Sequence, residues 1–368
     1  MNRTQRLLRS LPRDARLVEV GPSFAPLAPK REGWNTFVID HASRDDLVAK
    51  YTAHHGVDTT RIEEVDFVWQ GGSLADAVPA DQHGTFDAFI ASHVIEHTTD
   101  VVTFLQAAET LIRPDGVIIL AVPDKRKCFD FYRHPSTTGD ALAAFLEKRA
   151  RHDTRTHFES VMRTIHKGGA PGWPGDDTRE GVIAIPFDKA HEQLALAGLP
   201  EYVDAHNWIF VPSSFRLMLL ELAAMGYLDL RVDEIAEAEA TEFYAWLRRG
   251  RVPMEAAELQ TARRHLMDRI IVELSQQLRQ LPEALRSEDG PEAQFLNGIK
   301  EADFRTEATQ IVLAAVLAST GWRGLNRRKF RRLIAEASRS IPVSGPAAVQ
   351  HLVLLEGAQK VLGSDPAD

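Results

Sequence analysis

Residues 16–123 alternate between short apolar runs and segments of helical pattern. Five of the apolar runs are typical of buried strands: RLVEVG, NTFVIDHA, EEVDFVW, FDAFIAS and VIILAVP. Residues 100–112, DVVTFLQAAETLI, place apolar side chains on one face of a helix. Strands that alternate with helices in this way predict a doubly wound parallel sheet. The ligands of such a sheet bind at the carboxyl ends of the strands, where the strand order reverses.

Beyond this region the pattern changes. Residues 124–205 hold charged helical stretches around the segment KGGAPGWPGDD, which predicts an insertion that closes over the ligand site as a lid. SSFRLMLLELAAMG then predicts a helix that ends at Gly226, and YLDLRVDEI and ATEFYAWLRR predict two closing strands. We therefore expect a first domain that spans residues 1–250.

Helical patterns dominate after Pro253. Seven apolar residues recur at spacings of three and four and predict one long helix: Leu259, Ala262, Leu266, Ile270, Leu274, Leu278 and Leu281. Further helices are expected at 305–319, 326–338 and 346–362. Residues 251–368 are thus expected to form a helical packing or dimerisation module, through which two copies of the chain could associate as a homodimer.

Charge, cysteine content and hydropathy narrow the class of protein. The 368 residues carry 43 basic and 52 acidic side chains, and the net charge of −9 argues against a dedicated nucleic-acid binder. The sequence has no apolar run long enough to cross a membrane and only one cysteine, Cys128, so we expect a reducing, cytoplasmic setting. The basic stretch WRGLNRRKFRR at 322–332 is either a solvated helix face or a site for an anionic partner.

The loop after the first expected strand begins at Gly21 and reads GPSFAP. A nicotinamide-binding loop needs the pattern G-x-G-x-x-G, because the backbone must approach a pyrophosphate group closely. GPSFAP lacks the second and third glycines of that pattern. We therefore expect this loop to bind a ligand that has no pyrophosphate group.

Four segments resemble, in order, the motifs of class I S-adenosylmethionine (SAM)-dependent methyltransferases. They are EVGPSFAP, VIDHA, FDAFIASHVIEHTTDVVTFLQAAETLIRPDGVIILAVPD and DAHNWIFVPSSFRLMLLELAAMGY, and the resemblance covers roughly residues 15–250. It implies an α/β fold with a Rossmann-like, doubly wound, mostly parallel seven-stranded sheet, a helical insertion and a C-terminal helical module. It also implies an enzyme with SAM as its cofactor.

The resemblance assigns the cofactor to residues near the ends of the first four strands. Glu19 and Gly21 match the acidic residue and first glycine of the family's first motif, and Ser23 stands where the family often has a glycine. Asp40 ends the second strand, where a carboxylate can accept hydrogen bonds from both ribose hydroxyls. The remaining expected contacts are Ser73 and Leu74 with the adenine, and Ser92 with the sulfonium.

The segment SHVIEHT places His93, Glu96 and His97 on one face if a helix begins there. A fourth residue, His206, belongs to a segment that folds over the acceptor side in the family. These four side chains could hold a divalent metal, in an arrangement similar to that of the small-RNA 3′-end 2′-O-methyltransferases, in which His93 would replace a Glu. Alternatively, His97 or His206 acts as a general base with Glu96 orienting the imidazole, or the side chains only pack locally.

These residues predict a SAM-dependent methyltransferase that acts by in-line displacement with help from the His/Glu cluster. The expected acceptor is a hydroxyl group of a sugar, a glycan intermediate or another small molecule, and a small-molecule amine is the nearest alternative. Two other functions stay open. One is a non-catalytic, methyltransferase-like scaffold in a glycan-assembly complex, and the other is a metal-dependent nucleic-acid 2′-O-methyltransferase.

Overall fold

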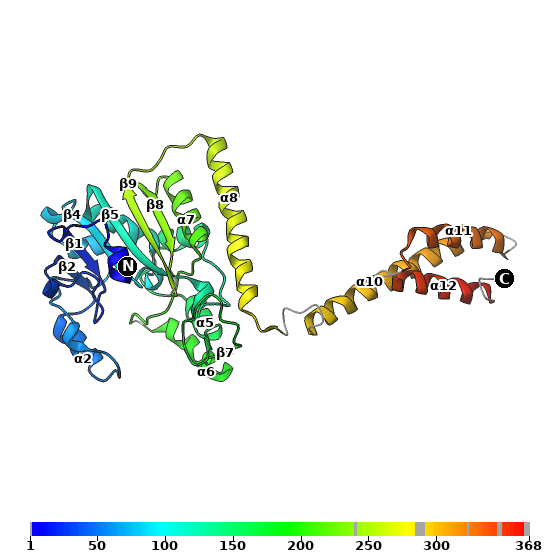
Figure 1. Ribbon diagram of the computed structural model, residues 1–368, viewed down its shortest axis with the longest axis horizontal. Helices are drawn as coiled ribbons and strands as arrows, with labels where there is room; N and C mark the ends of the chain where they lie inside the picture. The colour runs from blue at the N-terminus through cyan, green and yellow to red at the C-terminus, as the bar shows by residue number, and fades with distance from the viewer. Residues whose placement is uncertain are drawn as a thin grey trace. The chain divides into compact units, whose positions relative to one another are not determined.

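The computed structural model describes residues 2–199, 201–238, 241–283, 291–321, 324–343 and 348–363, without the side chains of 190, 291–303 and 321. Its centre is a seven-stranded sheet in the order β3-β2-β1-β4-β5-β9-β8 (Figure 1). The strands are β1 (Arg16–Val20), β2 (Asn35–Asp40), β3 (Phe67–Val68), β4 (Phe86–Ser92), β5 (Ile112–Pro123), β8 (Leu230–Glu237) and β9 (Glu242–Arg249). Neighbouring strands from β3 to β5 are parallel, whereas β9 is antiparallel to β5 and β8. The predicted mostly parallel, doubly wound sheet is confirmed.

The central strands are apolar throughout because both faces of the sheet are covered. In β5, Ile118 and Leu120 belong to one core, whereas Val117 and Ile119 point the opposite way into a second core. The first core is shared with α3 (Val101–Leu111), α4 (Thr138–Leu146) and α7 (Pro212–Ala224), and the second with α1 (Arg3–Leu7). The helix α2 (Arg44–Tyr51) follows β2 along the chain. The order reverses between β1 and β4, so their carboxyl ends mark the expected ligand site.

The predicted insertion at 124–205 contains helices and one short ribbon. Besides α4 it holds α5 (Thr154–Met162), α6 (Phe187–Glu192), the 3-10 turn η7 (Gln193–Gly198), β6 (Ile165–Lys167) and β7 (Gly181–Ile183). The stretch HFESVMRTIH was predicted as helix throughout, but its last two residues belong to β6. Ile165 is fully buried and pairs with Ile183 of β7, so strand pairing ends the helix there.

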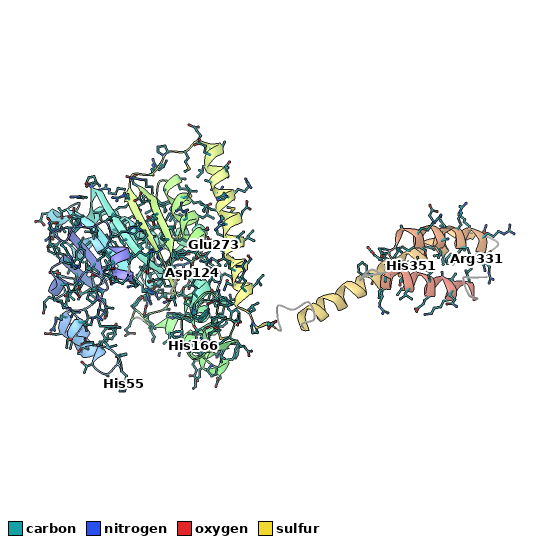
Figure 2. The ribbon with its side chains drawn as sticks, viewed as in Figure 1. His55, Asp124, His166, Glu273, Arg331 and His351 are labelled. Carbon is teal, nitrogen blue, oxygen red and sulfur yellow. The ribbon has the colours of Figure 1, made fainter. Side chains whose placement is uncertain are left out.

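The structure divides the chain after Leu281 rather than after residue 250. The helix α8 (Ala256–Ser275) belongs to the first unit because it packs along α7 (Figure 1). Glu273 of α8, labelled in Figure 2, is buried, and its carboxylate accepts hydrogen bonds from the backbone N–H and the hydroxyl of Ser213 at 3.0 and 2.6 Å. The apolar residues predicted to line one face between Leu259 and Leu281 are only partly buried. Leu266 is buried, but Leu278 is 60% exposed.

The second unit has a core of its own. Its helices α10 (Pro291–Ser319), α11 (Arg327–Ser340) and α12 (Ala348–Leu362) confirm the three predicted helices, and β10 (Thr320–Gly321) and β11 (Gly324–Leu325) lie between the first two. Phe330 and Ile334 of α11 are buried in this core. Trp322 and Arg323 of the basic stretch lie outside the described residues, whereas Arg331, labelled in Figure 2, is exposed with its basic neighbours on α11. Within the described ranges, no helix is long and apolar enough to span a membrane.

We expect Glu273→Ala to lower the free energy of unfolding by about 1–3 kcal/mol, because it leaves the buried hydroxyl and N–H of Ser213 without a partner. Urea unfolding of the full chain measures the change. Asp268→Ala on the same helix is the control, since the Asp268 side chain is 59% exposed and bonds only to Arg264 among the interactions described. An equal effect of the two substitutions would contradict the role of Glu273.

Candidate active site

A cavity of about 290 Å³ lies at the point where the strand order reverses. It is lined by residues 19–25 at the end of β1 and in the following loop, by Ser92 and His93 at the end of β4, and by Arg3 of α1. Four of the predicted cofactor residues, Glu19, Gly21, Ser23 and Ser92, therefore meet around one cavity. This is the position at which a doubly wound sheet binds its ligand.

The loop after β1 closes although it lacks two glycines of the nucleotide-binding pattern. Gly21 has a φ of +61°, and a Cβ atom there would lie 3.1 Å from Val94 Cγ2. Ser23 has a φ of +45°, so it adopts the left-handed conformation that glycine usually supplies. The buried Ser23 hydroxyl has no hydrogen-bond partner among the residues described. The missing glycine thus does not prevent the turn, and it leaves a polar atom for a ligand.

Glu19 holds the far end of the same loop. Its buried carboxylate accepts hydrogen bonds from the backbone N–H groups of Leu27 at 2.7 Å and Ala28 at 3.2 Å. Burial raises the pKa of Glu19 to about 7, although these two hydrogen bonds act in the opposite direction. Glu19 therefore shapes the cavity through the backbone that it binds.

Asp40 presents one free oxygen at the end of β2. Its Oδ1 accepts a hydrogen bond from the His41 backbone N–H at 2.8 Å and lies 2.7 Å from His41 Nδ1. Its Oδ2 is buried and, in the part of the chain that is described, unpartnered. A buried carboxylate oxygen without a donor is costly, and a ribose hydroxyl would supply that donor. The predicted ribose contact fits this geometry.

The predicted adenine contacts lie after β3, at the 3-10 turn η3 (Leu74–Ala77). The Ser73 hydroxyl caps this turn by accepting a hydrogen bond from the Ala75 N–H. The Leu74 side chain is buried in the larger core. Both residues occupy the strand end where they were expected, and their contact with a cofactor stays a prediction.

His93 does not share a helical face with Glu96 and His97. It has a φ of +54°, and the 3-10 turn η5 (Ile95–His97) begins only after it. A left-handed residue cannot belong to a right-handed helix, so the expected helix does not start there. His93 Nε2 instead lies 2.8 Å from Glu242 Oε2 of β9, while its Nδ1 lies 3.4 Å from Glu96 Oε1. Both ring nitrogens of the predicted metal ligand thus face carboxylates.

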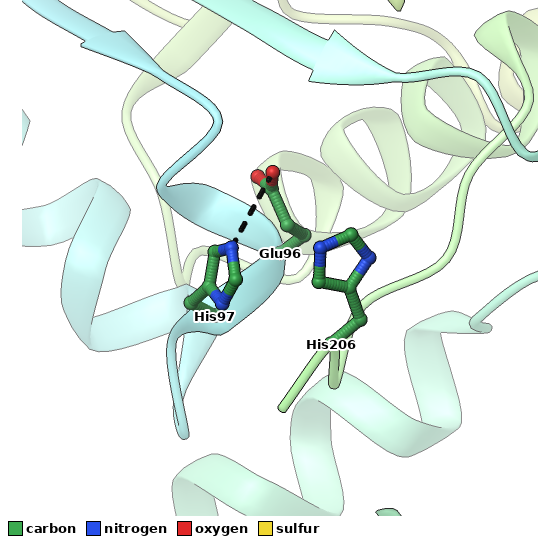
Figure 3. A group of neighbouring side chains, drawn as sticks. All are labelled: Glu96, His97 and His206. Carbon is green, nitrogen blue, oxygen red and sulfur yellow. Dashed lines mark ion pairs between the residues drawn. The ribbon is translucent and has the colours of Figure 1, made fainter. Parts of the chain in front are cut away.

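Glu96, His97 and His206 converge beside this point (Figure 3). One potential ligand atom from each lies within 4.8 Å of the others, and Glu96 Oε1 is 3.8 Å from His97 Nε2. The Glu96 side chain is 1% exposed, and neither of its oxygens has a hydrogen-bond partner within the described structure. The Glu96 carbonyl accepts the N–H groups of Asn207 and Trp208 at 2.7 and 3.1 Å, which joins the His206 segment to η5.

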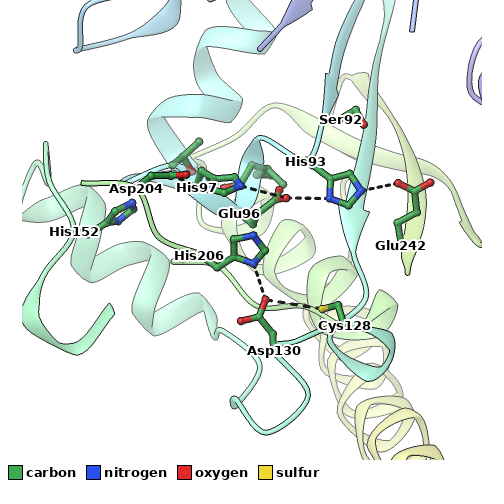
Figure 4. A network of polar contacts seen from close by, with 12 residues as sticks. Ser92, His93, Glu96, His97, Cys128, Asp130, His152, Asp204, His206 and Glu242 are labelled. Atoms are coloured by element: carbon green, nitrogen blue, oxygen red, sulfur yellow. Dashed lines mark hydrogen bonds and ion pairs between the residues drawn. The ribbon is translucent and has the colours of Figure 1, made fainter. Parts of the chain in front are cut away.

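Each imidazole of this cluster is oriented by a carboxylate. His97 Nδ1 lies 2.8 Å from Asp204 Oδ1, and His206 Nδ1 lies 2.6 Å from Asp130 Oδ2 (Figure 4). An ionised carboxylate can only accept a hydrogen bond, so both Nδ1 atoms donate, which leaves Nε2 of each ring available on the side of Glu96. A buried ion pair with Arg133 at 2.9 Å holds Asp130 in turn.

The charges of these groups follow from their neighbours. Burial raises the pKa of Glu96, but His93, His206 and His97 lower it more, so the pKa lies below its ordinary value. Burial lowers the pKa of His93, but Glu242 and Glu96 raise it to about 9. At neutral pH, Glu96 is therefore a carboxylate and His93 an imidazolium.

Four residues of the site were not predicted: Arg3, Asp130, Asp204 and Glu242. Asp204 lies two residues before His206, and a search for carboxylates near each candidate histidine would have found it. The other three come from segments far away in the sequence. No local pattern distinguishes them from other charged residues.

A family model described as a methyltransferase domain matches residues 1–185, half of the chain. Similar solved structures include a putative S-adenosylmethionine dependent methyltransferase from Listeria monocytogenes (11% identity, 67% of this chain and 97% of that chain, TM-score 0.35). Another S-adenosylmethionine dependent methyltransferase, from Mesorhizobium loti, has 14% identity over 67% and 98% of the two chains, with a TM-score of 0.34. A putative Zn-dependent alcohol dehydrogenase from Rhodobacter sphaeroides has 14% identity over 67% and 89%, with a TM-score of 0.37.

No curated protein matches the chain. The chain belongs to the methyltransferase-domain family. It is a class I SAM-dependent methyltransferase, and SAM is its cofactor.

We expect Asp40→Ala to weaken the binding of S-adenosylhomocysteine (SAH), the demethylated product, by about 10- to 100-fold, since hydrogen bonds to a charged group contribute about 1.5–3 kcal/mol. Calorimetric titration of the purified protein measures the affinity. Asp45→Ala in α2 is the control, because the Asp45 side chain is 95% exposed. Unchanged affinity in Asp40→Ala would remove this residue from the cofactor site.

His93 should titrate near pH 9 in an NMR experiment, and Glu242→Gln should bring its pKa down toward the ordinary value of 6.5. Because the pKa of His93 is higher in the folded protein, its ion pair stabilises the fold fully below about pH 6.5 and is lost as the pH rises through about 9. Glu237→Gln is the control, since the Glu237 side chain is half exposed and pairs with Arg126. A His93 pKa that is the same in Glu242→Gln as in the wild type would contradict the pairing of His93 with Glu242.

Proposed function

We propose that the protein transfers the methyl group of SAM to a hydroxyl group of a sugar or another small molecule, at the cluster of Glu96, His97 and His206. The observation that carries this proposal is the position of the cluster. Ser92 and His93 line the cofactor cavity, and His93 Nδ1 lies 3.4 Å from Glu96 Oε1. An acceptor bound at the cluster would be adjacent to the end of the cavity where the methyl group is expected.

The cluster fits a divalent cation. Two imidazoles and one carboxylate are a common ligand set for divalent transition metals and leave coordination positions open. The residues fit a cation because both oxygens of Glu96 are buried and have no hydrogen-bond donor in the described structure. A bound cation would supply the partner that they lack. Asp204 and Asp130 supply the outer carboxylates that usually orient metal-binding histidines. We therefore propose that Glu96, His97 and His206 hold a metal and that His93, the fourth predicted ligand, is a positioning residue.

The chemistry needs an acceptor oxygen aligned with the methyl group and the sulfur, and it needs the hydroxyl proton to be removed. SAM supplies an electrophilic methyl group on its sulfonium, and a bound cation would lower the pKa of a coordinated hydroxyl. Glu96 holds negative charge beside the acceptor position, and the carboxylate-bound imidazoles fix the direction of approach. A vicinal diol would use two open coordination positions, which favours a sugar over an isolated alcohol.

General base catalysis by His97 or His206 uses the same residues without a metal. In that case the free Nε2 of one imidazole would accept the hydroxyl proton, and its carboxylate partner would stabilise the imidazolium. Chelation distinguishes the two mechanisms, because only the metal-dependent one loses turnover. A nucleic-acid acceptor is supported by one observation, the exposed basic start of α11, whereas the net charge of −9 opposes it.

We expect chelator-treated protein to bind Mn²⁺ or Zn²⁺ in a calorimetric titration, and Glu96→Gln, His97→Ala and His206→Ala each to weaken this binding by at least about 10-fold. Transfer of labelled methyl groups to a panel of sugars and other diols should fall by at least about 100-fold in the same variants, while SAH affinity stays within about twofold. His191→Ala, an exposed histidine of the insertion, is the control.

The metal titration and the methyl-transfer assay can each contradict the proposal separately. Absent metal binding together with chelator-resistant turnover would favour the histidine base. Methyl transfer to RNA or DNA, with sugars inert, would replace the small-molecule acceptor by a nucleic acid. Full activity in His97→Ala or His206→Ala would remove that residue from the mechanism.

A further inference from the structure

We propose that Arg3 is a cofactor-binding residue whose guanidinium pairs with the carboxylate of the methionyl part of SAM. Arg3 lines the same cavity as residues 19–25 and Ser92. The methionyl carboxylate must leave water when the cofactor binds there, and a buried anion needs a cationic partner. Arg3, on the short N-terminal helix α1, is such a cation, and it lies outside the motifs at the strand ends.

The helix that carries Arg3 is fixed to the sheet. Asn2 and Gln5 form a capping box at its start, with the Gln5 N–H donating to the Asn2 side chain at 2.8 Å. Leu7 at its end is fully buried, and the Trp246 indole of β9 donates to the Leu7 carbonyl at 3.2 Å. The position of Arg3 over the cavity is therefore set by the fold.

Hydrogen bonds to Glu242 and Ser92 orient the Arg3 guanidinium. Its Nε and Nη2 donate to the two carboxylate oxygens of Glu242 at 2.6 and 2.7 Å, and Nη2 donates to the Ser92 hydroxyl at 2.6 Å. Its Nη1 makes no hydrogen bond to any described residue, and the side chain is 39% exposed. A guanidinium has five N–H groups, so Arg3 keeps donors free after binding Glu242 and Ser92.

The other charged groups at the cavity are already engaged. Glu19 uses both carboxylate oxygens to bind the backbone of Leu27 and Ala28. His93 directs one ring nitrogen to Glu242 and the other to Glu96. Figure 4 shows Ser92, His93 and Glu242 together at this edge of the sheet. Arg3, whose Nη1 is free of hydrogen bonds to the described residues, is therefore the available cation among those that line the cavity.

This assignment also accounts for the unusual loop after β1. GPSFAP has fewer glycines than a phosphate-binding loop and so presents less open backbone to an anion. A cation from α1, which lines the same cavity, compensates for this.

The test compares two ligands in calorimetric titrations of the full chain. SAH carries the methionyl carboxylate, whereas 5′-methylthioadenosine keeps the adenosine and the sulfur but lacks the amino-acid end. We expect Arg3→Gln to weaken SAH binding by about 10- to 100-fold and to change methylthioadenosine binding by less than about twofold. Arg3→Lys should fall between, because it keeps the charge but loses the forked geometry.

Arg6→Gln is the matched control on the same helix, since Arg6 lies over the Tyr244 ring, 5.3 Å from its centroid, and donates to the Glu237 carbonyl. It should leave both affinities within about twofold of the wild type. Equal losses for the two ligands in Arg3→Gln would overturn the proposal, because they would indicate a disturbed cavity. Unchanged SAH affinity would overturn it too. The titrations use neither metal nor acceptor. Their result can therefore be interpreted even if the proposed O-methylation is wrong.

Discussion

Glu96 is a carboxylate at 1% exposure with no hydrogen-bond donor for its oxygens in the described structure. Burying such a charge costs several kcal/mol unless opposite charges lie close to it. The cation beside it is His93 at the end of β4, and the imidazoles of His97 in η5 and His206 before α7 lie close to it as well. His93 and His97 belong to the same segment as Glu96, whereas His206 comes from a distant segment, so the buried charge requires the segment before α7 to pack against η5. The Glu96 carbonyl adds to this by binding the backbone after His206.

Glu242 connects the cluster around Glu96 to the cavity at the ends of β1 and β4. It accepts from His93 on one side and from Arg3 on the other. Glu242 can reach both because β9 runs antiparallel to β5 and its first residue pairs with Pro123, at the carboxyl end of β5. The amino end of an antiparallel strand lies at the edge where the parallel strands finish. The reversed strand thus contributes a charged residue to a ligand site that otherwise consists of strand ends and loops.

Much of the site could be predicted because its residues follow strands directly. Gly21 and Asp40 come after runs of apolar residues that can only be central strands, and the carboxyl ends of parallel strands share one edge. Glu96 and His97 were found for the same reason. Spacing alone predicts that His93 shares a helix face with Glu96 and His97, and the left-handed backbone of His93 contradicts that prediction. The structure divides the chain after Leu281, and the contact between Glu273 and Ser213 that keeps α8 with the first unit joins segments that no local pattern connects.

The sequence by itself determined the doubly wound sheet, the strand ends that carry the predicted cofactor residues and the positions of the main helices. It did so because apolar periodicity and turn residues act over a few neighbouring positions. The tertiary structure decided which charges meet: Asp130 with His206, Asp204 with His97, and Glu242 with both His93 and Arg3. Ion pairs between distant segments leave no periodic signal in a sequence. They arise only when packing of the sheet brings those segments to one edge, where burial makes each charge require a partner.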